Sequence, residues 1–436
     1  MKFIFADSLD YVDPGYDFEN DRHASGRKPY WNDHYPHEIL GYAPYDGVLV
    51  SRAIVGDHRI TGKYSESQAM RFRRVGARKF LRLEGPGLED KLLFGDCGAF
   101  SYVKQAEPPY TPEDMIAFYE DGGFTHGFSI DHIIFDFKPE AKSFWDGIDR
   151  NNPEQDDNYR RQRITLDLAE AFMRECRQQQ VRFTPVGVIQ GWSPISMAHA
   201  ARKLVDIGYR YLALGGMVPL QTSAIHTALR AVHKAIDGIP GVQLHILGFA
   251  KADALDEFVS YPLLHSIDTT SPLLRAFKDA RSNYYLPTPA GPIDYFAAIR
   301  IPQALENNTL LRAVKKGLYR QEDLLLKEKT ALEKIRAYDR NSASLEETLD
   351  AIMDYSRPLL CTDFQASRAE ENKFVQLYGH YRRTLEAKPW RQCDCPICKQ
   401  IGVEVIIFRS SNRNKRRGIH NLSVFYQHLQ TTRSSQ

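Results

Sequence analysis

Short apolar runs that end in a polar residue or a glycine alternate with amphipathic runs, and this alternation constrains the fold more than any other feature of the chain. Strands that are apolar throughout belong to parallel sheets covered by helices on both faces. Seven or eight such units close most naturally into a (β/α)8 barrel of the TIM type. Seven runs are evident in the sequence. The runs are residues 46–55, 91–100, 126–133, 181–191, 209–217, 242–250 and 262–270.

The stretches between these runs have helical periodicity. Apolar residues recur at i, i+3 and i+4 spacing in residues 162–180, and residues 194–207 and 221–236 are also amphipathic. Ser193 followed by Pro194 is typical of an N-cap and a proline in the first helical turn. The sequence therefore predicts an α/β fold in which helices cover a parallel sheet.

Changes in composition divide the chain into four expected segments. Residues 1–45, rich in turn formers and aromatic residues, predict an irregular N-terminal cap, and residues 46–300 predict the barrel core. Residues 301–390 have helical periodicity without strand-like runs and predict a helical insertion. Residues 391–436 contain clustered cysteines and a basic run and predict a zinc-binding subdomain with a basic segment.

The composition excludes several classes of protein. With 23 Phe and 23 Tyr among 436 residues, the chain can bury a large core, so disorder is excluded as the main state. No stretch approaches the roughly 20 apolar residues that cross a bilayer, and the N-terminal apolar run is too short for a signal peptide. A cytoplasmic location without membrane contact is expected. The net charge of +2 means that nucleic-acid binding must rest on local patches.

Polar residues and glycines stand at the ends of the apolar runs, where a TIM-type barrel has its active site. Any one of them could simply mark a turn between strand and helix. Three aspartates and a glutamine in the same relative position favour a functional site. The residues are Asp96, Asp131, Gln190, Gly215, Gly216, Gly248 and Asp268.

Three cysteines, Cys393, Cys395 and Cys398, form a C-x-C-x-x-C motif. Three thiolates this close need a fourth ligand to complete a tetrahedral zinc site, and both His420 and His428 follow at a suitable distance in the sequence. Such a site would be closed to water and structural in role. Zinc is therefore the expected cofactor.

These motifs together resemble the tRNA-guanine transglycosylase superfamily, zinc-bearing (β/α)8 barrels that exchange guanine for a 7-deazaguanine. The CDCPIC motif followed by HNLSVFY is similar to the family's zinc signature, which favours His420 over His428 as the fourth ligand. Residues 96–100 (DCGAF) are similar to its D-S-G-G-F/Y motif, 188–191 (VIQG) to its V-Q-G motif, and 214–217 (LGGM) to its G-G-L segment.

The resemblance implies roles for two of the expected site residues, and the chemistry of base exchange indicates roles for the others. Asp268 takes the place of the nucleophilic aspartate and Asp131 that of the base-reading aspartate, while Asp96 is placed to carry protons. Gln190 and the backbone N–H of Gly216 are expected to donate to O6 of the base. Phe100 and Leu247 either sandwich its ring or belong to the barrel core. The other expected substrate-binding residues are Gly215 and Gly248.

Departures from the family pattern bear on the substrate. Cys97 and Ala99 replace serine and glycine, and the residues after Asp268 lack the cysteine of the bacterial tRNA enzymes. These departures look more like the branch that inserts a 7-deazaguanine (preQ0-like) into DNA, with tRNA as the second substrate candidate. That branch is associated with a partner ATPase, and the tRNA enzymes form homodimers. A non-catalytic, zinc-stabilised nucleic-acid-binding protein is the alternative from a different class.

A basic run beside His420 is the expected site for phosphates of the nucleic acid. Charge runs are more often solvated faces of helices, but the family resemblance favours binding here. The residues concerned are Arg409, Arg413, Lys415, Arg416 and Arg417.

Overall fold

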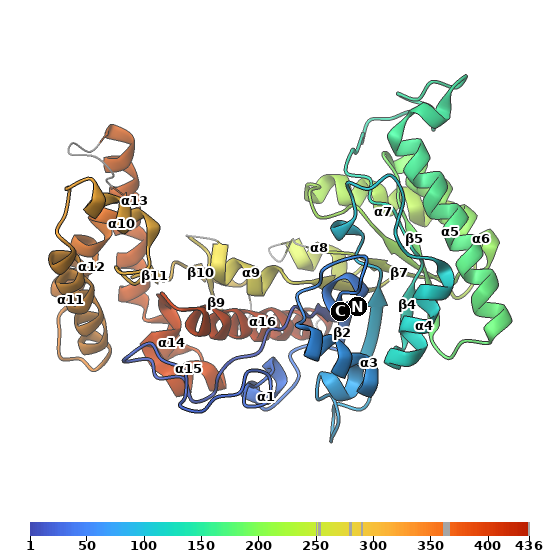
Figure 1. Ribbon diagram of the computed structural model, residues 1–436. Coiled ribbons are helices and arrows are strands. Elements are labelled where there is room, and N and C mark those ends of the chain that lie inside the picture. Colours follow the sequence, from blue (N-terminus) through green and yellow to red (C-terminus); the bar gives the residue numbers. More distant parts are fainter. Residues whose placement is uncertain (250, 252–253, 279–280, 289–290, 361–366, 435–436) are drawn as a thin grey trace. The chain divides into compact units, whose positions relative to one another are not determined.

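The computed structural model describes residues 1–249, 251, 254–278, 281–288, 291–360 and 367–434, which form two compact units (Figure 1). The barrel unit comprises residues 1–9, 45–271 and the C-terminal end from residue 432. The helical unit comprises residues 10–44 and 272–431. Each unit has its own cluster of buried apolar residues.

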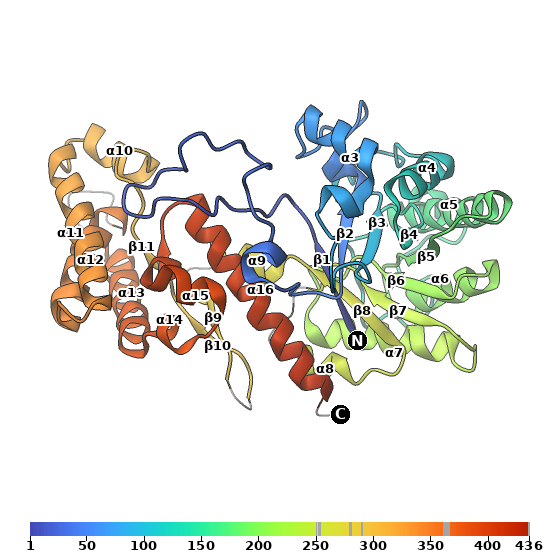
Figure 2. The ribbon, with the colours of Figure 1, turned by 90° about the horizontal axis from the view of Figure 1, so that it is seen from below.

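Eight parallel strands form a closed ring in the barrel unit, which confirms the predicted (β/α)8 barrel (Figure 2). The ring closes where Ile4 of the first strand pairs with Asp268 of the last. The strands are β1 (Lys2–Ala6), β2 (Gly47–Ser51), β3 (Leu92–Asp96), β4 (His126–Phe128), β5 (Thr184–Ile189), β6 (Tyr211–Leu214), β7 (Gln243–Ile246) and β8 (Leu264–Thr269).

Helices connect these strands and cover the outside of the ring (Figure 2). The bounds of α6 are those predicted, and the Ser193 hydroxyl caps it by accepting from the backbone N–H of Ser196. Helix α5 begins five residues before the predicted start, because Asp156 accepts from the first-turn N–H groups. The helices are α2 (Arg52–Val55), α3 (Glu66–Phe80), α4 (Pro112–Gly122), α5 (Asp157–Gln179), α6 (Pro194–Ile207), α7 (Thr222–Ile236) and α8 (Leu255–Val259).

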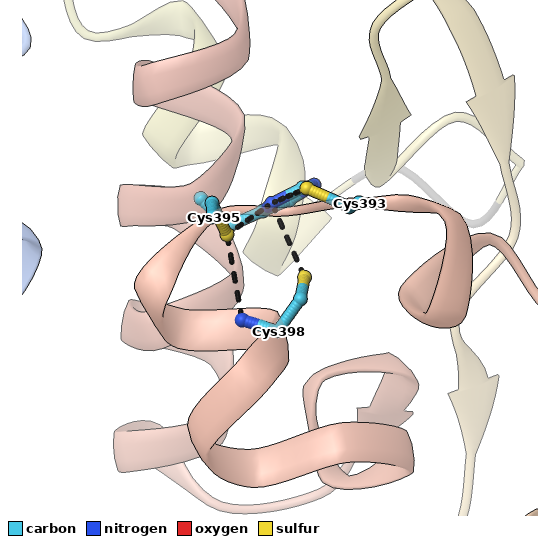
Figure 3. Close-up of side chains that lie close together, drawn as sticks. Cys393, Cys395 and Cys398 are labelled. Carbon is cyan, nitrogen blue, oxygen red and sulfur yellow. Dashed lines mark hydrogen bonds between the residues drawn. The ribbon is translucent and has the colours of Figure 1, made fainter.

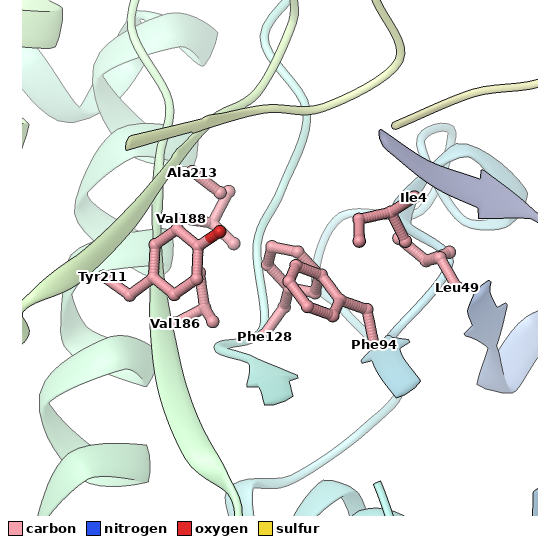
Figure 4. Packing of buried hydrophobic residues seen from close by; sticks show 8 residues of the cluster. All are labelled: Ile4, Leu49, Phe94, Phe128, Val186, Val188, Tyr211 and Ala213. Atoms are coloured by element: carbon pink, nitrogen blue, oxygen red, sulfur yellow. The ribbon is translucent and has the colours of Figure 1, made fainter. Parts of the chain in front are cut away.

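Side chains from alternate positions of the strands fill the barrel interior (Figure 4). Because side chains alternate across a strand, every second residue of β3 or β6 points into the ring. The buried core cluster consists of Ile4, Leu49, Phe94, Phe128, Val186, Val188, Tyr211 and Ala213. This packed layer supports the polar residues at the strand ends.

The expected segment boundaries need correction at both ends of the barrel. Residues 2–6 were expected to be irregular but form β1, which pairs with both β2 and β8. Residues 272–300 were expected to belong to the barrel and instead lie in the helical unit. Residues 10–44 have little regular structure apart from α1 (Pro36–Leu40), in line with the expected cap.

The helical unit consists mainly of helices, four of which (α10–α13) lie within residues 301–390. Two small sheets pair β9 (Tyr284–Leu286) with β10 (Asp294–Phe296) and β11 (Ile299–Arg300) with β12 (Ile407–Phe408). None of the helices in the described part of the chain combines the length and the apolar content of a membrane-spanning segment. The helices are α9 (Ser271–Lys278), α10 (Asn308–Lys315), α11 (Gln321–Asp339), α12 (Leu345–Leu360), α13 (Arg368–Ala387), α14 (Pro389–Gln392), α15 (Pro396–Ile401) and α16 (Ser411–Ser434).

Candidate active site and metal-binding cluster

The carboxyl ends of the strands bring the predicted polar residues to one end of the barrel. Asp96 is the last residue of β3, and Asp268 is the last but one of β8. Gln190 directly follows β5, and Asp131 lies three residues beyond β4. Because all eight strands run parallel, these side chains share the end at which TIM-type barrels bind their substrates.

Asp96 is an acid whose charge is poorly compensated. Its Oδ1 is buried and has no hydrogen-bond partner among the described residues. Burial raises the pKa of Asp96 to about 7, and the neighbouring charges of Asp268 and Asp131 add to the shift. These charges come from the same end of the barrel, since Asp131 follows β4, which pairs with β3, and Asp268 stands at the end of β8. A carboxyl group with this pKa can both give and take a proton near neutral pH.

Asp131 is held in place from two sides. The Nε2 of Gln190 donates to its Oδ2 at 2.6 Å, and the Cys97 thiol donates to its Oδ1 at 3.4 Å. The Tyr102 hydroxyl lies 2.9 Å from both the Cys97 sulfur and the backbone carbonyl of Asp131. Burial raises the pKa of Asp131 to about 6, while the two side-chain donors oppose that rise. Asp131 is therefore a rigidly oriented acceptor.

Two glycines allow the chain after β6 to approach Gln190. A Cβ on Gly215 would lie 2.2 Å from the Gln190 Nε2, and a Cβ on Gly216 would lie 2.8 Å from the carbonyl of Ile134. Gly216 also has φ +73°, which side chains disfavour. The Gln190 Oε1 accepts from the backbone N–H of Ile134 at 3.2 Å. Gln190 thus orients Asp131, and one of its amide hydrogens remains for a ligand.

Asp268 receives two hydrogen bonds on one oxygen. The Nε2 of His245 lies 2.9 Å from its Oδ1, and the backbone N–H of Gly248 donates to the same atom at 2.9 Å. His245 is fully buried, and Asp268 is 6% exposed. The site therefore fixes the orientation of the Asp268 carboxylate before any substrate binds.

The two side chains expected to sandwich a base differ in their surroundings. Phe100 is 58% exposed, and its ring centroid lies 5.9 Å from that of Phe135, which is also exposed. Leu247 is partly buried and packs against the barrel core. Phe100 is thus available for contact with a ligand, whereas Leu247 already has apolar neighbours inside the ring.

The predicted phosphate-binding run requires a correction. Arg413, Arg416 and Arg417 lie on α16 with no solvent exposure, so they cannot hold phosphates at the surface. Arg413 pairs with Asp21 and Glu404, and the guanidinium of Arg409 pairs with Asp21 and Glu328.

The other members of the run bind mainly backbone and amide oxygens. Arg416 donates to the carbonyl of Asp13 at 3.0 Å, and Arg417 to that of Ala276 at 2.6 Å. Lys415 donates to the carbonyl of Tyr11 at 3.2 Å. The run therefore anchors the N-terminal segment of the helical unit, and the sequence could not reveal this because the acceptors come from distant parts of the chain.

Four potential metal ligands meet in the helical unit. The sulfur atoms of Cys393, Cys395 and Cys398 (Figure 3) and the Nδ1 of His420 all lie within 4.8 Å of one another, and all four residues are buried. The Nδ1 of His420 lies 3.7, 3.3 and 3.5 Å from the three sulfur atoms in that order. His420, rather than His428, completes the cluster. The four residues could therefore hold a metal ion.

The second ring nitrogen of His420 has a separate partner. Its Nε2 lies 2.6 Å from the backbone carbonyl of Tyr285, and the ring of Tyr284 stacks on the imidazole at a centroid distance of 4.2 Å. A hydrogen on Nε2 leaves Nδ1 free to bind a metal, which is the usual arrangement around metal-ligating histidines. The donor set therefore fits a tetrahedral ion such as zinc.

Sequence reasoning missed the residues that support the three aspartates. In the sequence, His245 stands within an apolar run, and no local pattern indicates the roles of Cys97 and Tyr102. The alternation of side chains along a strand could have identified His245. It stands two residues before Leu247, so both side chains point into the ring. A histidine at an inward position directly below a strand end could have been recognised.

Comparison with known proteins agrees with this geometry. No family model matches the chain. The chain is 39% identical over 435 residues to a DNA-guanine transglycosylase from Salmonella montevideo, an alignment that covers 100% of this chain and 98% of that protein. Similarity of this extent includes both units as well as the cysteine cluster. The chain therefore belongs to the DNA-guanine transglycosylase family of pentosyltransferases.

Proposed function

We propose that this protein exchanges guanine in DNA for a 7-deazaguanine base of the preQ0 type, through a covalent intermediate between Asp268 and deoxyribose. The observation that carries the proposal is the gathering of Asp96, Asp131 and Asp268 at the carboxyl ends of the barrel strands, in a chain related over its full length to a DNA-guanine transglycosylase. The three carboxylates supply a nucleophile, a proton carrier and an acceptor for a purine edge.

In the first step, Asp268 displaces guanine from the sugar. A carboxylate oxygen of Asp268 donates an electron pair to C1′, and the pair of the C1′–N9 bond leaves with guanine. The departing base needs one proton, which Asp96 provides from its carboxyl group. The raised pKa of Asp96, about 7, keeps a substantial fraction of the group protonated at neutral pH.

In the second step, the incoming base replaces Asp268. The base transfers its N9 proton to the Asp96 carboxylate, N9 bonds to C1′, and the electron pair of the sugar–oxygen bond returns to Asp268. Both aspartates end in their starting protonation states. The cycle therefore needs no external acid, base or oxidant, and both steps invert at C1′, so the configuration is retained.

Recognition of the base is assigned to Asp131, Gln190 and Gly216. The fixed Asp131 carboxylate accepts from N1–H and the exocyclic amine of the purine. The remaining amide hydrogen of Gln190 donates to O6, which favours a base with an oxygen at position 6. A residue larger than glycine at position 216 would meet the carbonyl of Ile134. The exposed ring of Phe100 supplies a stacking face, since every purine offers one.

The metal at the cysteine cluster is proposed to be zinc in a structural role. A tetrahedral site with Zn–S of about 2.3 Å and Zn–N of about 2.0–2.1 Å places sulfur and nitrogen about 3.6 Å apart, close to the observed spacings. Four protein ligands leave no position for water, so the ion would stabilise the fold of the helical unit. It takes no part in the base exchange.

The proposal is tested by nucleoside analysis of cells with and without the protein. Mass spectrometry of hydrolysed DNA should detect a 7-deazaguanine deoxynucleoside only when the protein is present, and the Asp268→Asn variant should abolish it. Detection of the modified nucleoside only in tRNA would show that the substrate is tRNA and not DNA. Modification of neither nucleic acid, together with DNA binding that survives the variant, would favour a non-catalytic binding protein.

A further inference from the structure

Below the mouth of the barrel, a buried chain of polar side chains leads to the oxygen of Asp268. The Nε2 of His245 contacts Asp268 Oδ1 at 2.9 Å, and its Nδ1 lies 2.6 Å from the hydroxyl oxygen of Ser266. The hydroxyl of Tyr211 contacts that same oxygen. His245 and Ser266 have no solvent exposure, and Tyr211 is 4% exposed. The chain comes from three adjacent strands, β6, β7 and β8.

The positions of the hydrogens follow from the partners. An ionised carboxylate only accepts hydrogen bonds, so the Nε2 of His245 carries a hydrogen. A neutral imidazole then accepts at Nδ1 from the Ser266 hydroxyl, whose oxygen accepts from the Tyr211 phenol. Every donor in this series of three side chains has an acceptor. A doubly protonated imidazole would reverse the chain and leave the phenol hydrogen without an acceptor among the described residues, so the neutral form is favoured.

Aromatic packing holds the imidazole in this orientation. The ring centroids of Phe94 and Phe128 each lie 5.5 Å from that of His245. Both phenylalanines belong to the core cluster of the barrel, so rotation of the imidazole would require that core to move. The hydrogen on Nε2 therefore has a fixed position under Asp268.

The donors to Asp268 distinguish its two oxygens. His245 Nε2 and the backbone N–H of Gly248 both reach Oδ1. Building on the proposed function, we propose that His245 is a positioning residue that fixes Oδ1 and thereby presents Oδ2 to C1′. Nucleophilic attack depends steeply on orientation, because an oxygen displaced by about 1 Å can react about 100-fold more slowly. His245 does not touch the substrate and acts only through Asp268.

Three variants separate the hydrogen bond from the bulk of the ring. His245→Phe keeps a ring but removes the donor, and His245→Gln restores an N–H close to the position of Nε2. His126→Phe is the matched control, since His126 also packs on Phe94 and Tyr211, at centroid distances of 4.3 and 5.5 Å, and has no contact with Asp268.

The kinetic measurement is the rate at which purified protein forms the trapped covalent complex with a single-stranded, guanine-containing oligodeoxynucleotide. His245→Phe should lower this rate about 10- to 100-fold, as loss of a supporting hydrogen bond does in other sites. His245→Gln should recover most of the rate, and His126→Phe should keep it. Equal losses in the Phe and Gln variants, or a wild-type rate in His245→Phe, would overturn the positioning role.

A second measurement does not depend on activity. In protein labelled with ¹⁵N-histidine, the signals lost in His245→Phe should show a hydrogen on Nε2 and a bare Nδ1, and Asp268→Asn should shift them. A hydrogen on Nδ1 would overturn the proposal even if the kinetics agreed. Absence of any trapped complex with wild-type protein would instead count against the proposed function, while the ¹⁵N signals would still decide the hydrogen bond.

Discussion

The two units of this protein treat buried charge in opposite ways. In the helical unit, Arg413 is fully buried between Asp21 and Glu404, so opposite charges compensate each other. At the mouth of the barrel, like charges are gathered and the Asp96 Oδ1 has no hydrogen-bond partner among the described residues. Charges that maintain a fold are satisfied within it, whereas charges that act on a ligand are left for the ligand to complete.

The metal cluster is the strongest test of the structural side of this comparison. Cys395→Ser removes one of the four proposed ligands, and we expect loss of the metal ion and a drop of at least about 4 kcal/mol in the free energy of unfolding of the helical unit, because metal binding is coupled to folding. Metal content by mass spectrometry and urea denaturation measure both effects.

Cys176→Ser is the matched control for the cluster. Cys176 is a buried thiol on α5 outside the cluster, so its replacement should leave the metal content unchanged. Full metal retention in Cys395→Ser would contradict the assignment of the ligands.

The buried arginines give the next largest expected effect. Arg413→Met keeps the volume of the side chain and removes a charge, which leaves Asp21 and Glu404 less compensated. We expect the free energy of unfolding to fall by about 3–5 kcal/mol. The control is Arg320→Met, whose ion pair with Glu322 is exposed and should contribute no more than about 1 kcal/mol.

Urea denaturation compares the two arginine variants. If both variants have the same free energy of unfolding and only Arg413→Met weakens DNA binding, then Arg413 serves phosphate recognition. That result would break the contrast between the two units.

Removing a charge from the acidic cluster at the barrel mouth should raise the free energy of unfolding, whereas removing the charge of Arg413 should lower it. The pKa of Asp96 is about 7 when folded and lies near its ordinary value of 3.8 when unfolded. Stability from this group is therefore present below pH 4 and is lost as the pH rises through 7. Asp96→Asn should abolish turnover yet be more stable than the wild type at pH 8, by about 2 kcal/mol after allowance for solvent screening.

Thermal or urea unfolding at pH 5 and pH 8 checks this sign. The advantage of Asp96→Asn should shrink at the lower pH. Asp167→Asn, at an exposed position on α5, should show no such trend. A pH-independent difference for Asp96→Asn would mean that the charge at the barrel mouth is balanced.

The same contrast explains what the sequence could predict. Strands β2–β8 were predictable because each lies in an apolar run of the alternating strand and helix pattern, whereas β1 precedes a loop-rich segment that lacks this pattern. Asp96, Asp131 and Asp268 were predictable because strand polarity alone places them together. The partners of Arg413 were not, since Asp21 lies 392 residues away along the chain. Local patterns reveal positions on an element, but not contacts made by tertiary folding.

Aromatic rings show the same contrast between buried structural groups and exposed groups assigned to a ligand, and they give the smallest expected effect. Tyr284 is buried against His420, whereas Phe100 is 58% exposed and is assigned to stack on the base. Phe100→Leu should raise KM for 7-cyano-7-deazaguanine about 10-fold, since stacking of a base contributes about 1–3 kcal/mol, and should change stability little. Phe135→Leu removes the neighbouring exposed ring and should leave KM unchanged. Label incorporation into DNA at varied base concentration measures both variants. A raised KM in Phe135→Leu alone would assign the stacking role to Phe135, whose ring centroid lies 5.9 Å from that of Phe100.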